Sequence, residues 1–234
     1  MKPKLSFAHS LPLLFRLFRK EQTQSWKGLV AWILLGFPVF VTLLAQFNPN
    51  PSKIPPKGWF LFMINNLFFQ YFLWLIPFLY ASEAVIEEIR KGTIHFIWHT
   101  PLPKSHFLGA KFLITLWWTL PGILITETLC FLIWRIQDFY LLLALYGITL
   151  LGCLYFISVF LAIGVFFKKP MAAGILYGFF VEVVLSTLVD SEAHKLPALH
   201  KLYGLIARFD PKISAKELAK YGDPFWNILF LLGG

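Results

Sequence analysis

The stretch that decides the fold runs from Phe139 to Phe167 and reads FYLLLALYGITLLGCLYFISVFLAIGVFF. It contains no charged residue and no proline. An α-helix needs about 20 consecutive, mostly apolar residues to cross the hydrocarbon of a bilayer, and this run exceeds that length. The stretch therefore predicts a transmembrane α-helix.

The composition of the whole chain agrees with this prediction. Of the 234 residues, 58% are apolar, 18% are aromatic and only 14% are charged, whereas soluble domains carry about 25% charged residues. A soluble domain of this length has too little interior to bury so much apolar surface. The composition thus predicts an all-α integral membrane protein and argues against a soluble enzyme.

Five more apolar runs flank the first and predict a single six-helix transmembrane domain over residues 1–234. They cover residues 28–47, 58–81, 107–134, 171–189 and 224–234. The last run is too short to span a bilayer, so we expect that helix to be truncated or to enter the membrane only partly.

Two segments outside the runs have the pattern of amphipathic helices. Residues 4–27 place Phe and Leu on one side and basic residues on the other, which predicts a helix lying in the membrane interface. Residues 190–223 repeat leucines at helical spacing and predict an outer segment.

The basic residues give the orientation of the chain. The net charge is +9, and most Lys and Arg residues of the short loops fall on the side of the N-terminus. Cytoplasmic loops are enriched in these residues, so we expect a cytoplasmic N-terminus in the plasma (inner) membrane. Lipid head groups, not nucleic acid, are the partner that this distribution predicts.

The connector between the second and third runs, residues 82–106, reads SEAVIEEIRKGTIHFIWHTPLPKSH. Gly92 can end a first short helix, Thr93 can cap a second one, and Pro101 can end it. The residues predict two short helices at the cytosolic surface. On this evidence alone, a plain connector with no further role is equally consistent.

This connector resembles the signature of ABC-2-type ABC transporter permeases. In that family acidic residues precede a Gly-Thr pair, a Thr-Pro pair and a basic residue follow, and a Gly and a Lys begin the next span. The matching residues are Glu87, Glu88, Gly92, Thr93, Thr100, Pro101, Lys104 and Lys111. Gly109 lies one place from the usual Gly, and Arg90 and Lys91 stand where more acidic residues are usual.

The resemblance implies a type V exporter-like transmembrane domain that pairs with a second copy of itself. A separate cytosolic ABC ATPase subunit would hold ATP and Mg²⁺, since this chain has no GxxxxGKS or GxxxxGKT motif. We therefore expect no catalytic residue, metal or cofactor in this chain. The residues implied to couple it to the ATPase are Glu83, Glu87, Glu88, Arg90, Lys91, Gly92, Thr93, Pro101 and Lys104.

Polar side chains inside the runs are the other candidates for function. They are Asn65, Asn66, Gln70, Glu127 and Glu182. A carboxylate at the centre of a bilayer costs at least about 2.5 kcal/mol, so such residues usually face protein or a polar pathway. They predict either a lining for the substrate or hydrogen bonds that position helices.

Three other functions fit parts of the sequence. A haem-exporter-type permease subunit has a similar length and a similar Gly-Thr and Pro-Leu-Pro hairpin, although residues 190–223 argue against it. An intramembrane enzyme needs acids and histidines at one depth, whereas Glu127 and Glu182 lie in the runs and the histidines lie outside. A purely structural membrane subunit is the third alternative.

Overall fold

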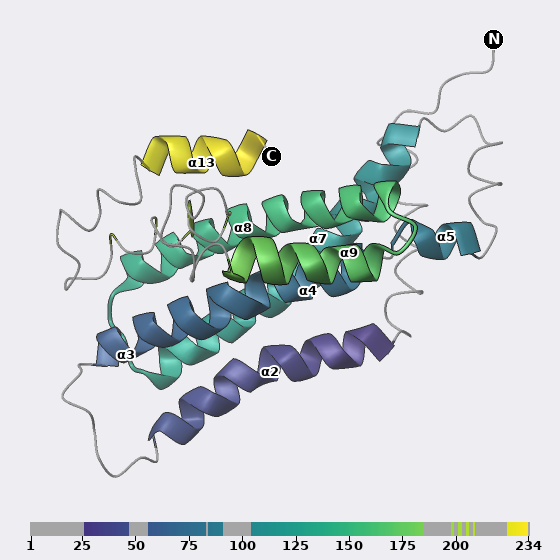
Figure 1. Cartoon of the computed structure of the whole chain (residues 1–234). Coiled ribbons are helices and arrows are strands. Elements are labelled where there is room, and N and C mark those ends of the chain that lie inside the picture. The colour runs from purple at the N-terminus through teal and green to yellow at the C-terminus, as the bar shows by residue number, and fades with distance from the viewer. Residues whose placement is uncertain are drawn as a thin grey trace.

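The computed structural model describes residues 26–46, 56–82, 84–90, 104–184, 198, 201–202, 205, 208 and 224–233. Within these residues every regular element is helical, which confirms the predicted all-α class. The longer helices run side by side as a bundle (Figure 1).

Ten helical elements are described. They are α2 (Trp26–Gln46), α3 (Pro56–Met63), η1 (Ile64–Phe72), α4 (Leu73–Ala81), α5 (Ile86–Arg90), α7 (Lys104–Ile133), α8 (Phe139–Phe166), α9 (Pro170–Leu176), η2 (Tyr177–Val184) and α13 (Pro224–Gly233). The elements η1 and η2 are π-helices. Residues on both sides of η1 keep helical backbone angles, so α3, η1 and α4 form one continuous rod.

Four of the helical stretches are long and apolar enough to cross a membrane. They are Gly28–Gln46, Lys57–Glu88, Ser105–Ile133 and Phe139–Phe166. Pro170–Glu182 is a shorter apolar helix. This confirms a multi-pass membrane protein, while the fifth and sixth spans stay predictions.

The predicted connector overlaps the start of the third long helix. Helix α7 begins at Lys104, so residues 104–106 belong to the third long helix. Pro103 immediately precedes it, and proline favours the first positions of a helix because it lacks the N–H that has no partner there. The last three residues of the predicted connector are thus the first turn of the third long helix, and the extent of the connector stays a prediction.

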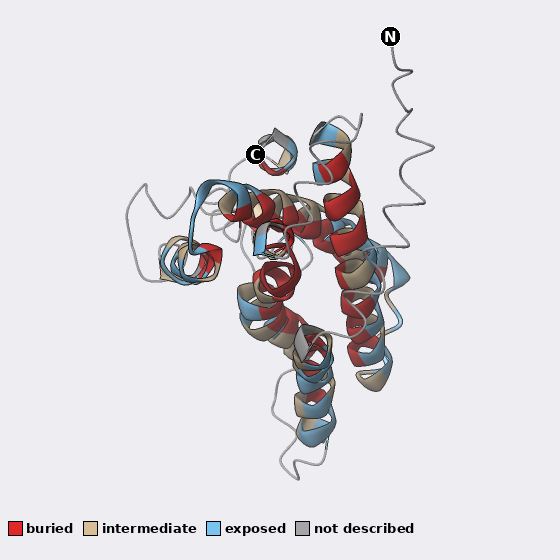
Figure 2. Ribbon diagram, turned by 90° about the vertical axis from the view of Figure 1, so that its right-hand side faces the viewer, coloured by how far each residue is buried: buried red, intermediate tan, exposed pale blue. Residues whose placement is uncertain are grey.

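Helix α4 lies at the centre of the bundle and contacts α8, α7 and α2. Nearly all of its residues are buried, as expected for a helix that is apolar on every side. Figure 2 shows buried residues on the facing sides of the helices and exposed ones on the outside. The outer side of α2 exposes Leu29, Trp32, Ile33 and Phe40.

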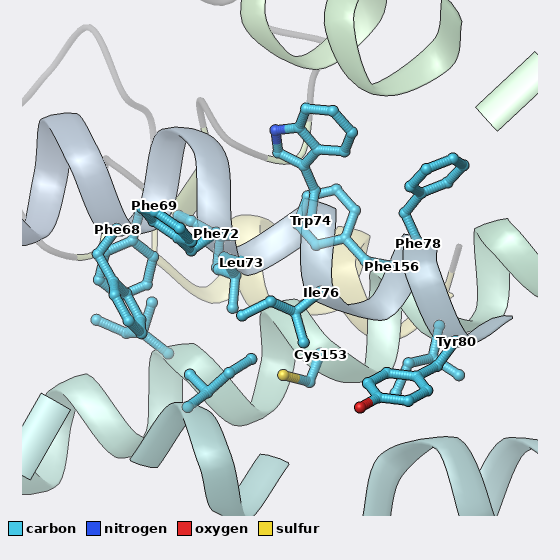
Figure 3. Close-up of a cluster of buried hydrophobic side chains, with 14 of the residues drawn as sticks. Phe68, Phe69, Phe72, Leu73, Trp74, Ile76, Phe78, Tyr80, Cys153 and Phe156 are labelled. Carbon is cyan, nitrogen blue, oxygen red and sulfur yellow. The ribbon is translucent and has the colours of Figure 1, made fainter. Parts of the chain in front are cut away.

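Aromatic rings fill the space around α4. Trp74 and Phe78 of this helix lie 6.5 Å and 5.3 Å from the ring of Phe160 in α8. Phe156 lies one turn before Phe160, with 6.3 Å between the ring centroids. Figure 3 shows this cluster along α4. Such ring pairs stabilise a core beyond the area that they bury.

Glycines allow α9 and η2 to approach α4 closely. Gly174 faces the Phe78 ring and Gly178 faces the Trp74 ring, and no room remains for a Cβ at either glycine. Small residues four apart are a common feature of helix contacts in membranes, because they let two backbones come together. The Gly174–Gly178 pair therefore seats α9 and η2 on the aromatic side chains of α4.

Candidate functional site

The connector begins by folding back against the bundle. Helix α4 ends at Ala81, and a turn from Ser82 to Val85 leads into α5. The amide of Ala84 donates to the carbonyl oxygen of Ala81 over 3.2 Å. Ala84 and Val85 are both only 6% exposed. The start of the connector is thus part of the packed core.

A buried ion pair then joins the connector to the third long helix. The Nζ atom of Lys111 in α7 lies 2.6 Å from Oε1 of Glu88 in α5. The two side chains are 5% and 2% exposed. The Lys111 ammonium also lies 5.9 Å from the centroid of the Phe107 ring. Removing one partner of such a pair leaves an uncompensated buried charge, which destabilises the protein strongly. The pair therefore resists separation of α5 from α7.

The structure shows where Glu88, one of the predicted coupling residues, lies. Its carboxylate points into the protein and pairs with Lys111, and its role in coupling stays a prediction. Successive residues of a helix lie about 100° apart, so Glu87 and Glu88 cannot share a face. Glu87 is partly exposed and Arg90 is exposed. These two remain the described candidates for an ATPase contact.

The other predicted coupling residues fall largely outside the described part of the chain. The residues outside it are Glu83, Lys91, Gly92, Thr93 and Pro101. Lys104 is the first residue of α7. Their roles stay predictions.

The first residue of the connector, Ser82, lies against α8. An added Cβ at Gly164 would lie 2.7 Å from the carbonyl oxygen of Ser82. The backbone of the turn therefore touches α8 where this helix nears its end. Together, Ser82 and Glu88 attach the connector to two different long helices.

The polar residues of the second and fifth runs lie in the two π-helices. Asn65, Asn66 and Gln70 belong to η1, and Glu182 belongs to η2. The two π-helices contact each other. Wider π turns occur frequently at functional sites in proteins. The structure thus places four of the five predicted intramembrane polar residues in two π-helices that contact each other.

In η2 the widened turn creates a hydrogen-bonded chain. The hydroxyl of Tyr177 donates to Oε1 of Glu182 over 2.6 Å. It also lies 3.1 Å from the hydroxyl of Tyr155 in α8. In an α-helix, residues five apart point about 140° away from each other, whereas i→i+5 bonding brings them to one side. The π-helix is therefore what places Tyr177 against Glu182.

In η1 the polar groups mainly serve their own helix. The amide nitrogen of the Asn66 side chain donates to the carbonyl oxygen of Phe62 over 2.9 Å. The Trp74 indole donates to the carbonyl oxygen of Gln70, also over 2.9 Å. The Oδ1 atom of Asn65 is buried and accepts no hydrogen bond from the described residues. Asn65 thus keeps unused hydrogen-bonding capacity among the described residues.

Glu127 lies apart from this layer. It is fully buried in α7, and the hydroxyl of Thr149 in α8 donates to its Oε1 atom. Its Oε2 atom accepts no hydrogen bond from the described residues. Glu127 therefore links the third and fourth long helices, and the structure does not place it with Glu182.

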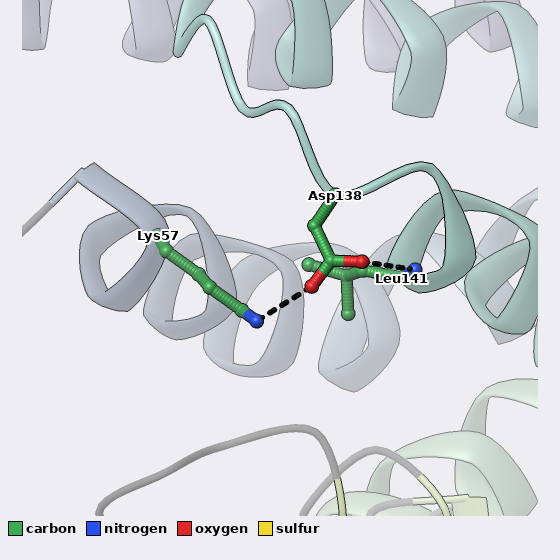
Figure 4. A network of polar contacts seen from close by, with 3 residues as sticks. All are labelled: Lys57, Asp138 and Leu141. Atoms are coloured by element: carbon green, nitrogen blue, oxygen red, sulfur yellow. Dashed lines mark hydrogen bonds and ion pairs between the residues drawn. The ribbon is translucent and has the colours of Figure 1, made fainter.

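At the opposite end of the bundle an exposed ion pair joins two further helices. The Lys57 ammonium lies 2.7 Å from Oδ2 of Asp138, and both side chains are 37% exposed (Figure 4). Asp138 also caps α8, because its Oδ1 atom accepts from the amide of Leu141. The hydrogen bond from Lys57 holds the pKa of Asp138 below its usual range.

Aromatic residues mark the same end. The rings of Trp59 and Trp134 stack with 6.5 Å between their centroids and 6° between their planes. Tryptophan is enriched where a membrane meets water. This end of the bundle thus has the chemistry of a membrane surface.

Sequence reasoning missed Tyr155, Tyr177 and the Lys57–Asp138 pair. The five-residue spacing of Tyr177 and Glu182 could not be recognised in the sequence. It brings the two side chains together only in a π-helix, which the apolar pattern does not predict. Asp138 could have been found, since an aspartate just before a long apolar run is a favourable helix cap. In the described part of the chain, no three His, Cys, Asp or Glu side chains converge as a metal site would require.

These features define a class of protein: a helical domain that crosses a membrane several times, with an end connector fastened to its long helices. A comparison with protein families is more specific. The model of the ABC-2 family transporter protein matches residues 20–186, and the chain therefore belongs to this family of membrane permeases. The match includes the four long apolar helices, α9 and η2. Comparisons with curated proteins and with solved structures give no significant match.

Proposed function

We propose that this permease is the membrane subunit of an exporter and that a separate cytosolic ATPase drives it through the connector of residues 82–106. Permeases of this family typically lack an ATPase domain. The single observation that carries the proposal is the buried Glu88–Lys111 pair, which fastens the connector to α7. A connector without a role in coupling has no need of a buried, charged joint.

The contacts suggest how motion reaches the long helices. A push on α5 is transmitted to α7 through the Glu88–Lys111 pair and to α8 through the contact between Ser82 and Gly164. The Glu88–Lys111 pair resists separation, because a buried charge without its partner is costly. The contact at Gly164 resists displacement, because it involves the backbone of Ser82 and not a flexible side chain. The two helices then tilt together, as a rigid-body switch between two states requires.

The contacting π-helices are the proposed substrate path. Tilting α8 moves Tyr155 relative to Tyr177 and thereby changes the hydrogen bonds around Glu182. The two π-helices adjoin the helices that the connector moves. The element η1 continues into α4, which contacts α7 and α8, and α9 contacts α8 and continues into η2. Glu127 keeps α7 and α8 together during this motion.

The remaining architecture follows the family resemblance. The proposal includes a homodimer, six spans with residues 4–27 as an interfacial helix, and a cytoplasmic N-terminus in the inner membrane. The exposed Arg90, Lys168 and Lys169 support this orientation, because they are the charges expected at a cytosolic surface. ATP and Mg²⁺ belong to the partner subunit, and the outward direction rests on the resemblance.

The test is co-purification of the full chain with an ABC ATPase subunit expressed beside it. The Glu87→Lys and Arg90→Glu variants change the described connector charges that reach the surface, and we expect at least tenfold less ATPase to be retained. Arg135→Glu is the matched control, since Arg135 is exposed at the opposite end. Full retention in both connector variants, or an equal loss in the control, would contradict docking at this site.

A further inference from the structure

The turn between α8 and α9 carries an unusual combination of side chains. Phe166 is 81% exposed and Phe167 is 54% exposed. Lys168 and Lys169 follow directly, and both are exposed. From this turn we propose a binding site for an anionic phospholipid of the cytosolic leaflet, with the lysines on the head-group phosphate and the phenylalanines on the acyl chains.

The length of α8 places this turn at the depth of the head groups. Helix α8 has 28 residues and is therefore about 42 Å long at 1.5 Å per residue. A bilayer with its head groups is about 40–45 Å thick. Asp138 caps the other end of α8 and pairs with the exposed Lys57. When that end lies at one membrane surface, the Lys168–Lys169 pair lies at the other.

The turn is held in shape before any lipid binds. The amide of Phe167 donates to the carbonyl oxygen of Ile163 over 3.0 Å, and the amide of Ala173 donates to that of Lys169 over 3.2 Å. Pro170 then begins α9 and fixes the backbone there. A preformed turn loses less conformational freedom on binding than a flexible one. The backbone that carries the two lysines is thus preformed.

The local charge favours a negative partner. No acidic residue occurs between Asp138 and Glu182, and Glu182 is fully buried. Within the described residues, neither Lys168 nor Lys169 forms an ion pair. Two exposed ammonium groups that form no ion pair with the described residues match the negative charge of an anionic head group.

The two phenylalanines distinguish a lipid from other anions. Large aromatic side chains exposed beside lysines are typical of the membrane interface, where the rings meet acyl chains and the ammonium groups extend outward. A soluble phosphate or an acidic protein surface uses the lysines but gains little from Phe166 and Phe167. Lipid is therefore the partner that accounts for all four side chains.

The test is native mass spectrometry of the detergent-solubilised full chain titrated with phosphatidylglycerol or with phosphatidylcholine. Each basic side chain near an anionic surface strengthens binding about fivefold, so the double variant Lys168→Gln, Lys169→Gln is expected to bind phosphatidylglycerol about thirtyfold more weakly. Phosphatidylcholine binding is expected to stay unchanged. Thermal unfolding confirms that the variant is folded.

Two further variants complete the experiment. Arg135→Gln removes an exposed positive charge at the opposite end and is expected to leave the tightest phosphatidylglycerol site intact. The double variant Phe166→Ser, Phe167→Ser is expected to weaken binding of both lipids. Unchanged phosphatidylglycerol binding without the lysines, or an equal loss in Arg135→Gln, overturns the proposal.

The proposal is independent of coupling to an ATPase, because the assay contains only the permease and lipid. If the lysine variant instead loses a co-expressed ATPase subunit while its lipid binding is unchanged, the turn is a protein contact and the lipid site is wrong. Loss of lipid binding with ATPase retention supports the lipid site.

Discussion

At the scale of single residues, the two described ion pairs differ most in burial. The side chains of Lys111 and Glu88 are 5% and 2% exposed, whereas those of Lys57 and Asp138 are both 37% exposed. Breaking a buried pair costs about 3–5 kcal/mol, but an exposed pair contributes only about 0–1 kcal/mol. Removing one partner is therefore expected to cost far more at the Glu88–Lys111 pair than at the Lys57–Asp138 pair.

The exposed pair leads to a prediction about pH. Lys57 lowers the pKa of Asp138 in the folded protein, so the pair stabilises above the unfolded pKa of about 3.9 and this contribution is lost as pH falls through the folded pKa. The variant Asp138→Asn, which still can cap α8, should melt slightly below the wild type at pH 6. Thermal unfolding of the solubilised chain should show the difference vanish in acid, and a difference that grows in acid would contradict the assignment.

At the scale of elements, close contacts hold the second long helix. Gly164 of α8 meets the Ser82 backbone just beyond α4, while Gly174 and Gly178 meet the aromatic face of α4. These glycines let α8, α9 and η2 contact α4 and the residue that follows it. Since protein interiors are close-packed, even one added methyl group at such a contact is felt.

The variant Gly164→Ala tests the contact on which α8 depends. The added methyl would lie 2.7 Å from the Ser82 carbonyl oxygen, and overpacking of this kind costs about 1–3 kcal/mol. Gly147→Ala is the control in the same helix, because nothing lies within 4 Å of its Cβ position, and alanine favours a helix by up to about 1 kcal/mol. Equal melting temperatures for the two variants would show that Gly164 is not a contact.

The elements also show how far sequence reasoning reaches. Long apolar runs predict spans because the bilayer sets their length, and four of them appear as long helices. The π-helices leave no such trace, since Tyr177 and Glu182 sit in a run that fits an α-helix equally well. The connector was located, but the role of Glu88 was not, because its partner Lys111 lies 23 residues along the chain.

At the scale of the whole molecule, the proposed mechanism connects a cytosolic ATPase contact to the π-helices inside the membrane. Exposed groups of α5 lie at one end, the Glu88–Lys111 joint follows, and the contacting η1 and η2 hold the polar side chains. The family assignment supplies an ATPase partner for this arrangement. The account therefore depends on the joint transmitting motion and not merely on its stabilising the fold.

The most direct test is a charge exchange measured by ATPase activity. The full chain is reconstituted with its ATPase subunit, and hydrolysis is compared with that of the subunit alone. Glu88→Lys and Lys111→Glu should each abolish the stimulation by the permease, because each leaves two like charges buried together. The double variant should restore it, since the pair is re-formed in reverse. Full stimulation in both folded single variants would contradict the account.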